Sequence, residues 1–201
     1  MRIKNFAVFC GSNLGNSGLY SEMAKELAER MSIANLGMVY GGAKVGLMGI
    51  IANHMLEKGS QVIGVIPQSL VDVEVAHDGL TQLHIVNSMH ERKRLMSELA
   101  DGFILMPGGL GSLEEFFEVL TLAQLGYHKK PCGILNGGGY YDYLLEFLNT
   151  AAKQGFIKTA HRKMILVEQN ASDLINACIN YQPPLDKKWI SKTLDNNFSP
   201  A

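Results

Sequence analysis

The chain has 201 residues, of which 47% are hydrophobic and 18% charged, and its formal net charge is −1. The apolar share is enough for a packed core and excludes a disordered chain, and the even charge balance excludes the basic surface expected of a protein that binds nucleic acid. Glycine is the unusual component, with 21 residues, about a tenth of the chain against a usual ~7%.

Short apolar runs alternate with longer amphipathic segments, and glycine stands at most of the junctions. The apolar runs predict strands at 6–10, 38–40, 61–66, 83–86, 103–106, 132–135 and 163–167. The amphipathic segments predict helices at 20–34, 46–57, 89–100, 112–125, 141–153 and 171–179. Apolar strands joined by helices are typical of a parallel sheet covered on both faces. We therefore expect a single-domain, Rossmann-like, doubly wound α/β fold over residues 1–181, followed by an irregular tail at 182–201.

The cysteines and the apolar runs indicate the compartment. Cys10, Cys132 and Cys178 lie far apart without CxxC spacing, so neither a disulfide framework nor a zinc site is expected. The six histidines also lack metal-ligand spacing. The N-terminal apolar run is too short for a signal peptide, and no run approaches the ~18 residues of a membrane helix. The sequence predicts a cytoplasmic protein with no membrane partner.

Three glycine-containing loops follow strands and precede helices, at 11–13, 41–49 and 108–112. In a doubly wound sheet, ligands bind beyond the carboxyl ends of the strands, where helix N-termini favour anions. None of the loops is a dinucleotide fingerprint with its acidic residue, and none is a Walker A loop, so a mononucleotide or sugar phosphate remains. One such loop could serve only a tight turn, but three at one end of a sheet favour a ligand.

The 108–112 loop also suggests a purely structural interpretation. Ser112 and Glu115 have the Ser-x-x-Glu spacing of a capping box, in which the serine begins the helix and the glutamate returns to its amide. On spacing alone this interpretation is favoured over a ligand, because it explains both residues.

Arg92 and the helix at 112–125 both depart from ordinary amphipathic patterns. Arg92 falls inside an apolar stripe that includes Met89, Met96 and Leu99, and a buried arginine needs an anion because an unpaired buried charge costs several kcal/mol. That partner could be a core carboxylate or a helix C-terminus with a purely structural role, or it could be an anionic ligand or a catalytic carboxylate. The helix at 112–125 is apolar on nearly all sides, which predicts a homodimer with this helix at or near the contact.

Two motifs together resemble the LOG (Lonely Guy) family, whose members are cytokinin riboside 5′-monophosphate phosphoribohydrolases often labelled possible lysine decarboxylases. The motifs are Met89-His90-Glu91-Arg92-Lys93 and Pro107-Gly108-Gly109-Leu110-Gly111-Ser112-Leu113-Glu114-Glu115. The resemblance extends from Phe6 to about Val167. Ser112 stands where the family has threonine, and Ala43 stands where its upstream glycine run has a third glycine.

The resemblance implies that Arg92 and Glu115 are catalytic. The substrate-binding residues that it implies are Gly11, Ser12, Gly41, Gly42, Glu74, Lys93, Gly108, Gly109, Leu110, Gly111, Ser112, Leu113, Glu114 and Thr121. The implied reaction hydrolyses the N-glycosidic bond of an adenine-type nucleoside 5′-monophosphate, either a cytokinin riboside 5′-monophosphate or AMP, to the free base and ribose 5-phosphate. Glu115 would stabilise the oxocarbenium-like transition state or activate water, with no cofactor and no metal.

A second hypothesis is a non-catalytic carrier of a nucleotide-like ligand, such as a molybdenum-cofactor carrier on the same kind of fold. The Arg92–Glu115 pair distinguishes the two, because a carrier has no need of it. A lysine decarboxylase would need a lysine that holds pyridoxal phosphate, and no lysine here has a supporting motif.

Overall fold

The computed structural model describes residues 2–71 and 76–184, which form a seven-stranded parallel sheet in the order β4-β3-β2-β1-β5-β6-β7. The strands are β1 (Asn5–Phe9), β2 (Gly37–Tyr40), β3 (Val62–Pro67), β4 (Gln82–Val86), β5 (Gly102–Leu105), β6 (Cys132–Leu135) and β7 (Ile165–Glu168). The helices are α1 (Gly18–Ile33), α2 (Gly46–Glu57), α3 (Gln68–Val71), α4 (Met89–Leu99), α5 (Leu110–Leu125), α6 (Asp142–Lys153), α7 (Thr159–Arg162) and α8 (Ala171–Ile179), with a 3₁₀ turn at Gly137–Gly139.

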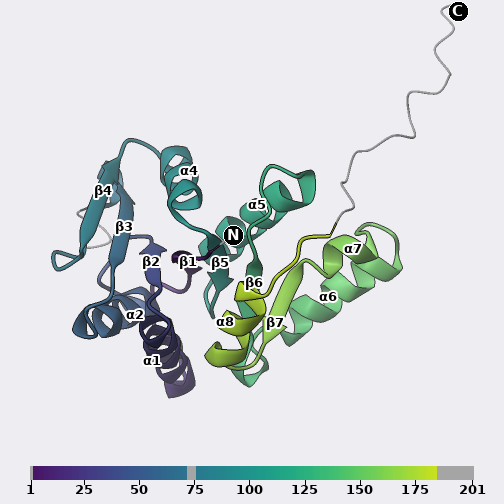
Figure 1. The fold of residues 1–201 in the computed structure, drawn as a ribbon, viewed down its shortest axis with the longest axis horizontal. Helices are drawn as coiled ribbons and strands as arrows, with labels where there is room; N and C mark the ends of the chain where they lie inside the picture. The colour runs from purple at the N-terminus through teal and green to yellow at the C-terminus, as the bar shows by residue number, and fades with distance from the viewer. Residues whose placement is uncertain (1, 72–75, 185–201) are drawn as a thin grey trace, which may run out of the picture.

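Helices cover both faces of the sheet, as Figure 1 shows, with α1, α2 and α8 below it in that view and α4 and α5 above it. The central strands are buried except at Asn5, and successive side chains pack into opposite cores because strand side chains alternate between the two faces. In β1, Phe6 and Val8 join the core under α1, α2 and α8, while Ala7 and Phe9 join the core under α4, α5 and α6. The predicted doubly wound α/β fold is confirmed.

The element boundaries follow the sequence pattern with a few differences. The predicted bounds of α2, β6 and α8 are confirmed. The strand predicted at 163–167 begins only at Ile165, because α7 occupies the preceding residues and Lys163 is its C-cap. The division into a domain at 1–181 and a tail at 182–201 stays a prediction, since residues 185–201 lie outside the described part of the chain.

The sheet changes winding direction at β1, and this places the site. The chain builds β2, β3 and β4 on one side of β1 and then returns to place β5 on the other side. At this switch point the Gly11 amide donates to the carbonyl of Pro107 (3.0 Å), and the Leu47 amide donates to the carbonyl of Gly11 (3.1 Å). The loops after β1 and β5 and the start of α2 thus meet at the carboxyl edge, where ligands bind in such sheets.

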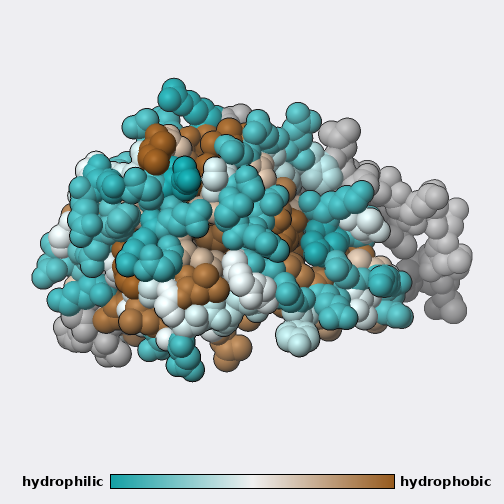
Figure 2. Space-filling view, turned by 90° about the horizontal axis from the view of Figure 1, so that it is seen from below, coloured by the Kyte–Doolittle hydropathy of each residue, from teal (hydrophilic) through white to brown (hydrophobic). Residues whose placement is uncertain are grey.

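Hydrophilic side chains cover much of the surface seen in Figure 2, with smaller apolar patches between them. Within the described residues, no helix combines the length and the apolar character that a membrane span requires.

Candidate active site

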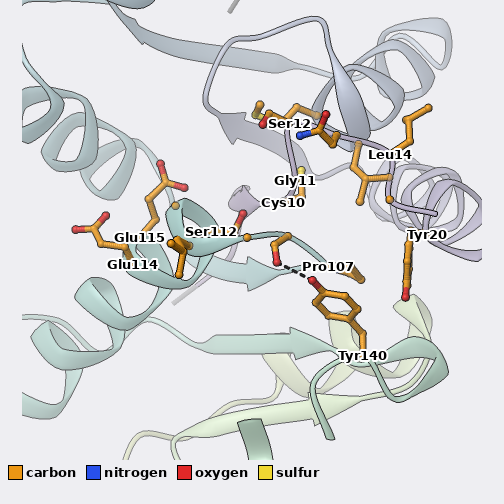
Figure 3. Close-up of a pocket in the computed structure, with 18 of the residues that line it drawn as sticks. Cys10, Gly11, Ser12, Leu14, Tyr20, Pro107, Ser112, Glu114, Glu115 and Tyr140 are labelled. Atoms are coloured by element: carbon orange, nitrogen blue, oxygen red, sulfur yellow. Dashed lines mark hydrogen bonds between the residues drawn. The ribbon is translucent and has the colours of Figure 1, made fainter. Parts of the chain in front are cut away.

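A cavity of about 510 Å³ opens at the switch point, beyond the carboxyl ends of β1 and β5 (Figure 3). Its wall is built from the loop after β1, the 108–112 loop and side chains of α1, α2, α4 and α5. The lining residues are Cys10, Gly11, Ser12, Asn13, Leu14, Gly15, Tyr20, Leu47, Met48, Leu70, Met89, Arg92, Pro107, Gly108, Gly109, Leu110, Gly111, Ser112, Glu114, Glu115 and Tyr140.

The start of α5 forms part of this wall, and it contradicts the capping-box prediction. The helix begins at Leu110, two residues earlier than predicted, after an extended Gly109 that acts as N-cap without a side-chain hydrogen bond. Ser112 is therefore inside the first turn and buried. The Leu113 amide donates to the Gly109 carbonyl (3.1 Å), which leaves the earlier amides of the turn without an intrahelical acceptor. These amides belong to residues that line the cavity and make it suited to an anion.

Glu115 contributes a carboxylate to the same cavity from the second turn of α5 (Figure 3). Its side chain is half-buried. The thiol of Cys10 lines the wall nearby, and its pKa is raised well above the usual range, first by burial and second by the negative charge of Glu115. The carboxylate therefore lies in a pocket whose wall also carries an uncharged thiol.

Arg92 enters the cavity from the first turn of α4, and the prediction that it faces inward is confirmed by its exposure of only 6%. Its Nη2 donates to the carbonyl oxygen of Gly41 (3.3 Å), just after β2, and Nη1 lies 3.8 Å from the sulfur of Met89. Met89 itself is exposed and lines the cavity, so the apolar stripe of this helix does not enter the core at its first turn. Arginine and glutamate thus reach one cavity from α4 and α5.

Lys93 does not line this cavity. Its ammonium group lies between two carboxylates of α5, at 2.5 Å from Glu114 Oε1 and 3.0 Å from Glu118 Oε2. The pKa of Lys93 is raised, chiefly by the hydrogen bond to Glu114. The side chain that follows Arg92 thus ties α4 to the helix that carries Glu115.

Four further predicted residues, Leu113, Thr121, Gly41 and Gly42, do not line the cavity. Leu113 packs against the core between the sheet and α5. Thr121 is exposed, and its hydroxyl donates to the carbonyl of Phe117 in its own helix (2.7 Å). Gly41 and Gly42 lie behind Arg92 at the end of β2, and Glu74 lies outside the described residues.

Several lining residues are missing from the sequence prediction. Tyr20 and Leu14 come from α1 and the loop before it, and Met48 comes from α2, where methionine is usually core filler. Tyr140 follows the glycine run Gly137–Gly139, and its hydroxyl donates to the Gly108 carbonyl (2.9 Å; Figure 3). The glycine run is the one sequence signal that could have pointed to Tyr140.

Within residues 2–71 and 76–184, no three His, Cys, Asp or Glu side chains gather in a metal-binding arrangement.

Known proteins are similar to this chain over most of its length. A family model described as possible lysine decarboxylase matches residues 48–178. The chain is 47% identical over 175 residues to the cytokinin riboside 5′-monophosphate phosphoribohydrolase of Rhodococcoides fascians, covering 87% of this chain and 88% of the relative. It is 43% identical to an enzyme of the same name from Arabidopsis thaliana, covering 92% of this chain and 81% of the relative.

The solved structures that it resembles are more distant. A molybdenum cofactor binding protein from Rippkaea orientalis matches with a TM-score of 0.66 at 18% identity, covering 88% of this chain and 95% of that one. At this identity the likeness shows the fold alone. The curated relatives, by contrast, are 47% and 43% identical over 87% and 92% of this chain. The chain therefore belongs to the LOG family of cytokinin riboside 5′-monophosphate phosphoribohydrolases, whose family model is described as possible lysine decarboxylase.

Proposed function

We propose that this protein hydrolyses the N-glycosidic bond of adenine-type nucleoside 5′-monophosphates, releasing the free base and ribose 5-phosphate. The substrates are cytokinin riboside 5′-monophosphates, AMP or both. The curated relatives carry the name of this activity. The observation that carries the proposal is that one cavity brings together Glu115, Arg92 and the first-turn amides of α5. Its volume of about 510 Å³ lies within the ~300–1,000 Å³ of small-molecule sites.

The phosphate binds at the start of α5 in this proposal. Amides without intrahelical partners and the positive end of the helix dipole stabilise the 5′-phosphate there. The loop after β1, with Gly11 and Ser12, faces the same cavity and adds polar groups from the other side. Anchoring the phosphate fixes the position of the ribose relative to the carboxylate of Glu115, which lowers the entropic part of the barrier.

The bond that breaks joins C1′ of the ribose to the ring nitrogen of the base. Its electron pair leaves with the base, and positive charge develops on C1′ and the ring oxygen. The carboxylate of Glu115 stabilises this charge and accepts a proton from the water whose oxygen bonds to C1′. The departing base takes up a proton at the freed ring nitrogen, and Glu115 returns its own proton to solvent, which restores the carboxylate. The guanidinium of Arg92 orients the carboxylate and holds ribose or phosphate oxygens through its planar set of donors.

The other residues implied by the family act mainly through their neighbours. Gly41 holds Arg92 through its carbonyl oxygen, and Lys93 holds α4 against α5 through Glu114. Leu113 packs under the first turn of α5. For Gly42, Thr121 and Glu74, the family resemblance alone supports a role in substrate binding.

The active form is a homodimer in this proposal, as the sequence predicts. The apolar positions of α5 are largely covered within the chain, where Phe116, Val119 and Leu120 are buried. Two strongly exposed aromatic side chains lie on α6, which packs on the same face of the sheet: Tyr143 is 87% and Phe147 65% exposed. They are four residues apart and share one helix face. Exposed aromatic residues of this kind are enriched at protein interfaces.

The assembly can be tested by light scattering after gel filtration. The wild-type chain is expected to have twice the monomer mass at micromolar concentration, and Phe147→Lys to shift it towards the monomer. Glu146→Lys, at the neighbouring exposed position, adds the same lysine without removing an aromatic side chain and is the control. A monomeric wild-type mass contradicts the dimer.

A cytoplasmic location completes the proposal. All three cysteines are buried and free in the structure, as expected of a protein in a reducing compartment.

The activity is tested by incubating the protein with AMP and with isopentenyladenosine 5′-monophosphate and measuring the released base and ribose 5-phosphate by chromatography. Glu115→Gln is expected to reduce kcat by about 10²–10⁴-fold, with the melting temperature unchanged because Glu115 does not cap α5. Glu98→Gln, on the exposed face of α4, is the control. No release from either substrate by the wild type, or full activity of Glu115→Gln, overturns the proposal.

A further inference from the structure

We propose that Tyr140 is a positioning residue, whose hydroxyl fixes the orientation of an amide that holds the 5′-phosphate. The inference rests on the proposed function, because it takes the 108–112 loop and the start of α5 as the phosphate site. It also assigns a purpose to the glycine run before Tyr140, which the sequence and the reaction leave unexplained.

The contact is a hydrogen bond between the loop after β6 and the loop after β5. The Tyr140 hydroxyl donates to the carbonyl oxygen of Gly108 at 2.9 Å, and Tyr140 lines the cavity (Figure 3). In a trans peptide the carbonyl of one residue and the amide of the next point to opposite sides of one rigid plane. Holding the Gly108 oxygen therefore sets the direction of the Gly109 amide, at the N-cap of α5.

The Gly108–Gly109 peptide needs such a restraint because neither residue has a side chain that could limit its backbone rotation. Gly108 and Gly109 are consecutive glycines, which have the widest conformational freedom of any residue. A Cβ built on Gly109 would have no atom within 4 Å, so this part of the chain borders open space. Without the Tyr140 bond, the Gly108–Gly109 peptide could rotate and turn a carbonyl oxygen towards the phosphate.

Tyr140 is itself held in place from both sides. Its ring makes an edge contact with Tyr20 of α1, with centroids 5.4 Å apart, and another with Tyr141 at 4.7 Å. Gly138 and Gly139 have left-handed φ angles of 66° and 72°, which turn the chain after β6 towards the cavity. The aromatic contacts and the glycine turn together direct the Tyr140 hydroxyl towards the Gly108 carbonyl.

The turn is fixed by a buried side chain. The Oδ1 atom of Asn136 accepts from the Tyr141 amide, and its Nδ2 donates to Asp142 Oδ1, both at 2.7 Å. Asn136 is buried, so these bonds form in an environment with little competing water. The position of Tyr140 is therefore determined by the fold before any ligand binds.

The chain offers a matched control in the next residue. The hydroxyl of Tyr141 donates to the carbonyl of Met106 (2.8 Å), in the segment that enters the 108–112 loop. Tyr141 is buried and is absent from the cavity wall. Tyr140→Phe and Tyr141→Phe therefore remove the same chemical group from neighbouring residues. The Tyr140 hydroxyl lies on the cavity wall, and the Tyr141 hydroxyl meets the backbone of Met106 and Gly108 from the core.

The experiment compares the wild type, Tyr140→Phe and Tyr141→Phe as full chains. Calorimetric titration with ribose 5-phosphate and with inorganic phosphate measures phosphate binding without catalysis, and AMP hydrolysis gives kcat and KM. Tyr140→Phe is expected to weaken ribose 5-phosphate binding and raise KM by about 3- to 10-fold, the value of one hydrogen bond, with kcat nearly unchanged. Tyr141→Phe is expected chiefly to lower the melting temperature, with a smaller effect on binding and KM than Tyr140→Phe, because its hydroxyl supports the loop from the core.

Three outcomes overturn the inference. One is wild-type ribose 5-phosphate affinity in Tyr140→Phe, and another is equal losses of affinity and melting temperature in both variants, which would indicate a merely structural hydroxyl. A wild type that binds neither ribose 5-phosphate nor phosphate also overturns it. A wild type that binds ribose 5-phosphate but cleaves no nucleotide refutes the proposed function, while the binding data still decide the role of Tyr140.

Discussion

The guanidinium of Arg92 is bonded to the main chain of Gly41, from Nη2 to the carbonyl oxygen at 3.3 Å, although 51 residues separate them in sequence. The end of β2 thereby sets the position of an arginine carried by α4. A side chain with several rotatable bonds is held on the cavity wall by a rigid strand end, so the geometry of the arginine depends on a residue that does not itself line the cavity.

Gly41→Ala is expected to disturb this arginine without unfolding the protein. A Cβ on Gly41 would collide with Arg92 Nη2, which lies at the far end of a flexible side chain that can shift. We expect kcat/KM to fall by about 10²-fold, as for a displacement of about 1 Å in a catalytic group, with a nearly unchanged melting temperature. AMP hydrolysis and thermal unfolding measure the two quantities.

The control for that variant is Gly18→Ala at the start of α1, where an added Cβ meets no atom within 4 Å. Full activity in Gly41→Ala would show that the position of Arg92 is unimportant for the reaction.

Lys93→Met is expected to lower both stability and activity modestly. The lysine joins α4 to Glu114 and Glu118 of α5, but the glutamates are partly exposed, so the loss of unfolding free energy is about 1 kcal/mol or less. Activity falls because Arg92 and Glu115 sit beside this link on the two helices. Urea unfolding of Lys93→Met, Glu118→Gln and the double variant measures the coupling.

If Lys93 acts through its charge, Lys93→Arg retains most of the stability, and the loss in Lys93→Met shrinks at high salt. Additive losses in the double-variant cycle would exclude coupling to Glu118.

Acid is expected to destabilise the protein through His128. Burial is the main factor that lowers its pKa, and the charge of Lys130 lowers it further, while the bond to Val119 acts in the opposite direction. Its Nδ1 accepts from the Lys130 amide (3.2 Å), so Nε2 carries the proton and donates to the Val119 carbonyl (2.9 Å). Protonation of Nδ1 breaks the first of these bonds.

His77 responds to pH in the same direction. Burial is the main factor that lowers its pKa, with Asp78 raising it and Lys44 lowering it. Its Nδ1 accepts from the Gly79 amide at 3.1 Å, and its Nε2 lies 2.8 Å from Asn53 Oδ1. The neutral ring fits both partners.

For both histidines the unfolded chain binds protons more readily than the folded one. Their contribution to stability is therefore complete above about pH 6.5, the ordinary histidine pKa, and declines as the pH falls below it. Urea unfolding at pH 7, 6 and 5 should show a falling free energy, with a smaller fall in His128→Gln. A flat profile would contradict the assignment of neutral rings.

The thiols are expected to be unreactive in the folded protein. Burial raises the pKa of Cys178 to about 12 and raises those of Cys10 and Cys132 further, so little thiolate forms at neutral pH. Titration with a thiol reagent should proceed only as fast as the protein unfolds, and completely in denaturant. Rapid labelling of the native protein at Cys10 would show that the cavity wall opens.

Much of the fold follows from local sequence patterns. Runs such as Phe6 to Cys10 are apolar on both faces, which only a sheet covered twice can accommodate, and glycines at the strand ends mark the carboxyl edge. The short helices α3 and α7 escape prediction because four residues are too few to show helical periodicity.

The site is only partly predictable for physical reasons. Arg92 stands out because a charge inside an apolar stripe conflicts with local amphipathicity. The start of α5 is not predictable in this way. Its N-cap is Gly109, which has no side chain that could mark a cap in the sequence, whereas Ser112 and Glu115 have the spacing of a capping box without forming one. Tyr140 reaches the site through a contact across 32 residues, and such a contact leaves no periodic pattern.

The reversal of strand order at β1 divides the site between two stretches of chain. Gly41 and Arg92 belong to the stretch that builds β1 to β4, whereas the first turn of α5, Glu115 and Tyr140 follow β5. A nucleotide in the cavity would contact both stretches at once and join them as a removable cross-link does. Occupancy of the cavity would then protect both halves of the sheet from unfolding and proteolysis, so the lifetime of the protein would follow the supply of its substrate.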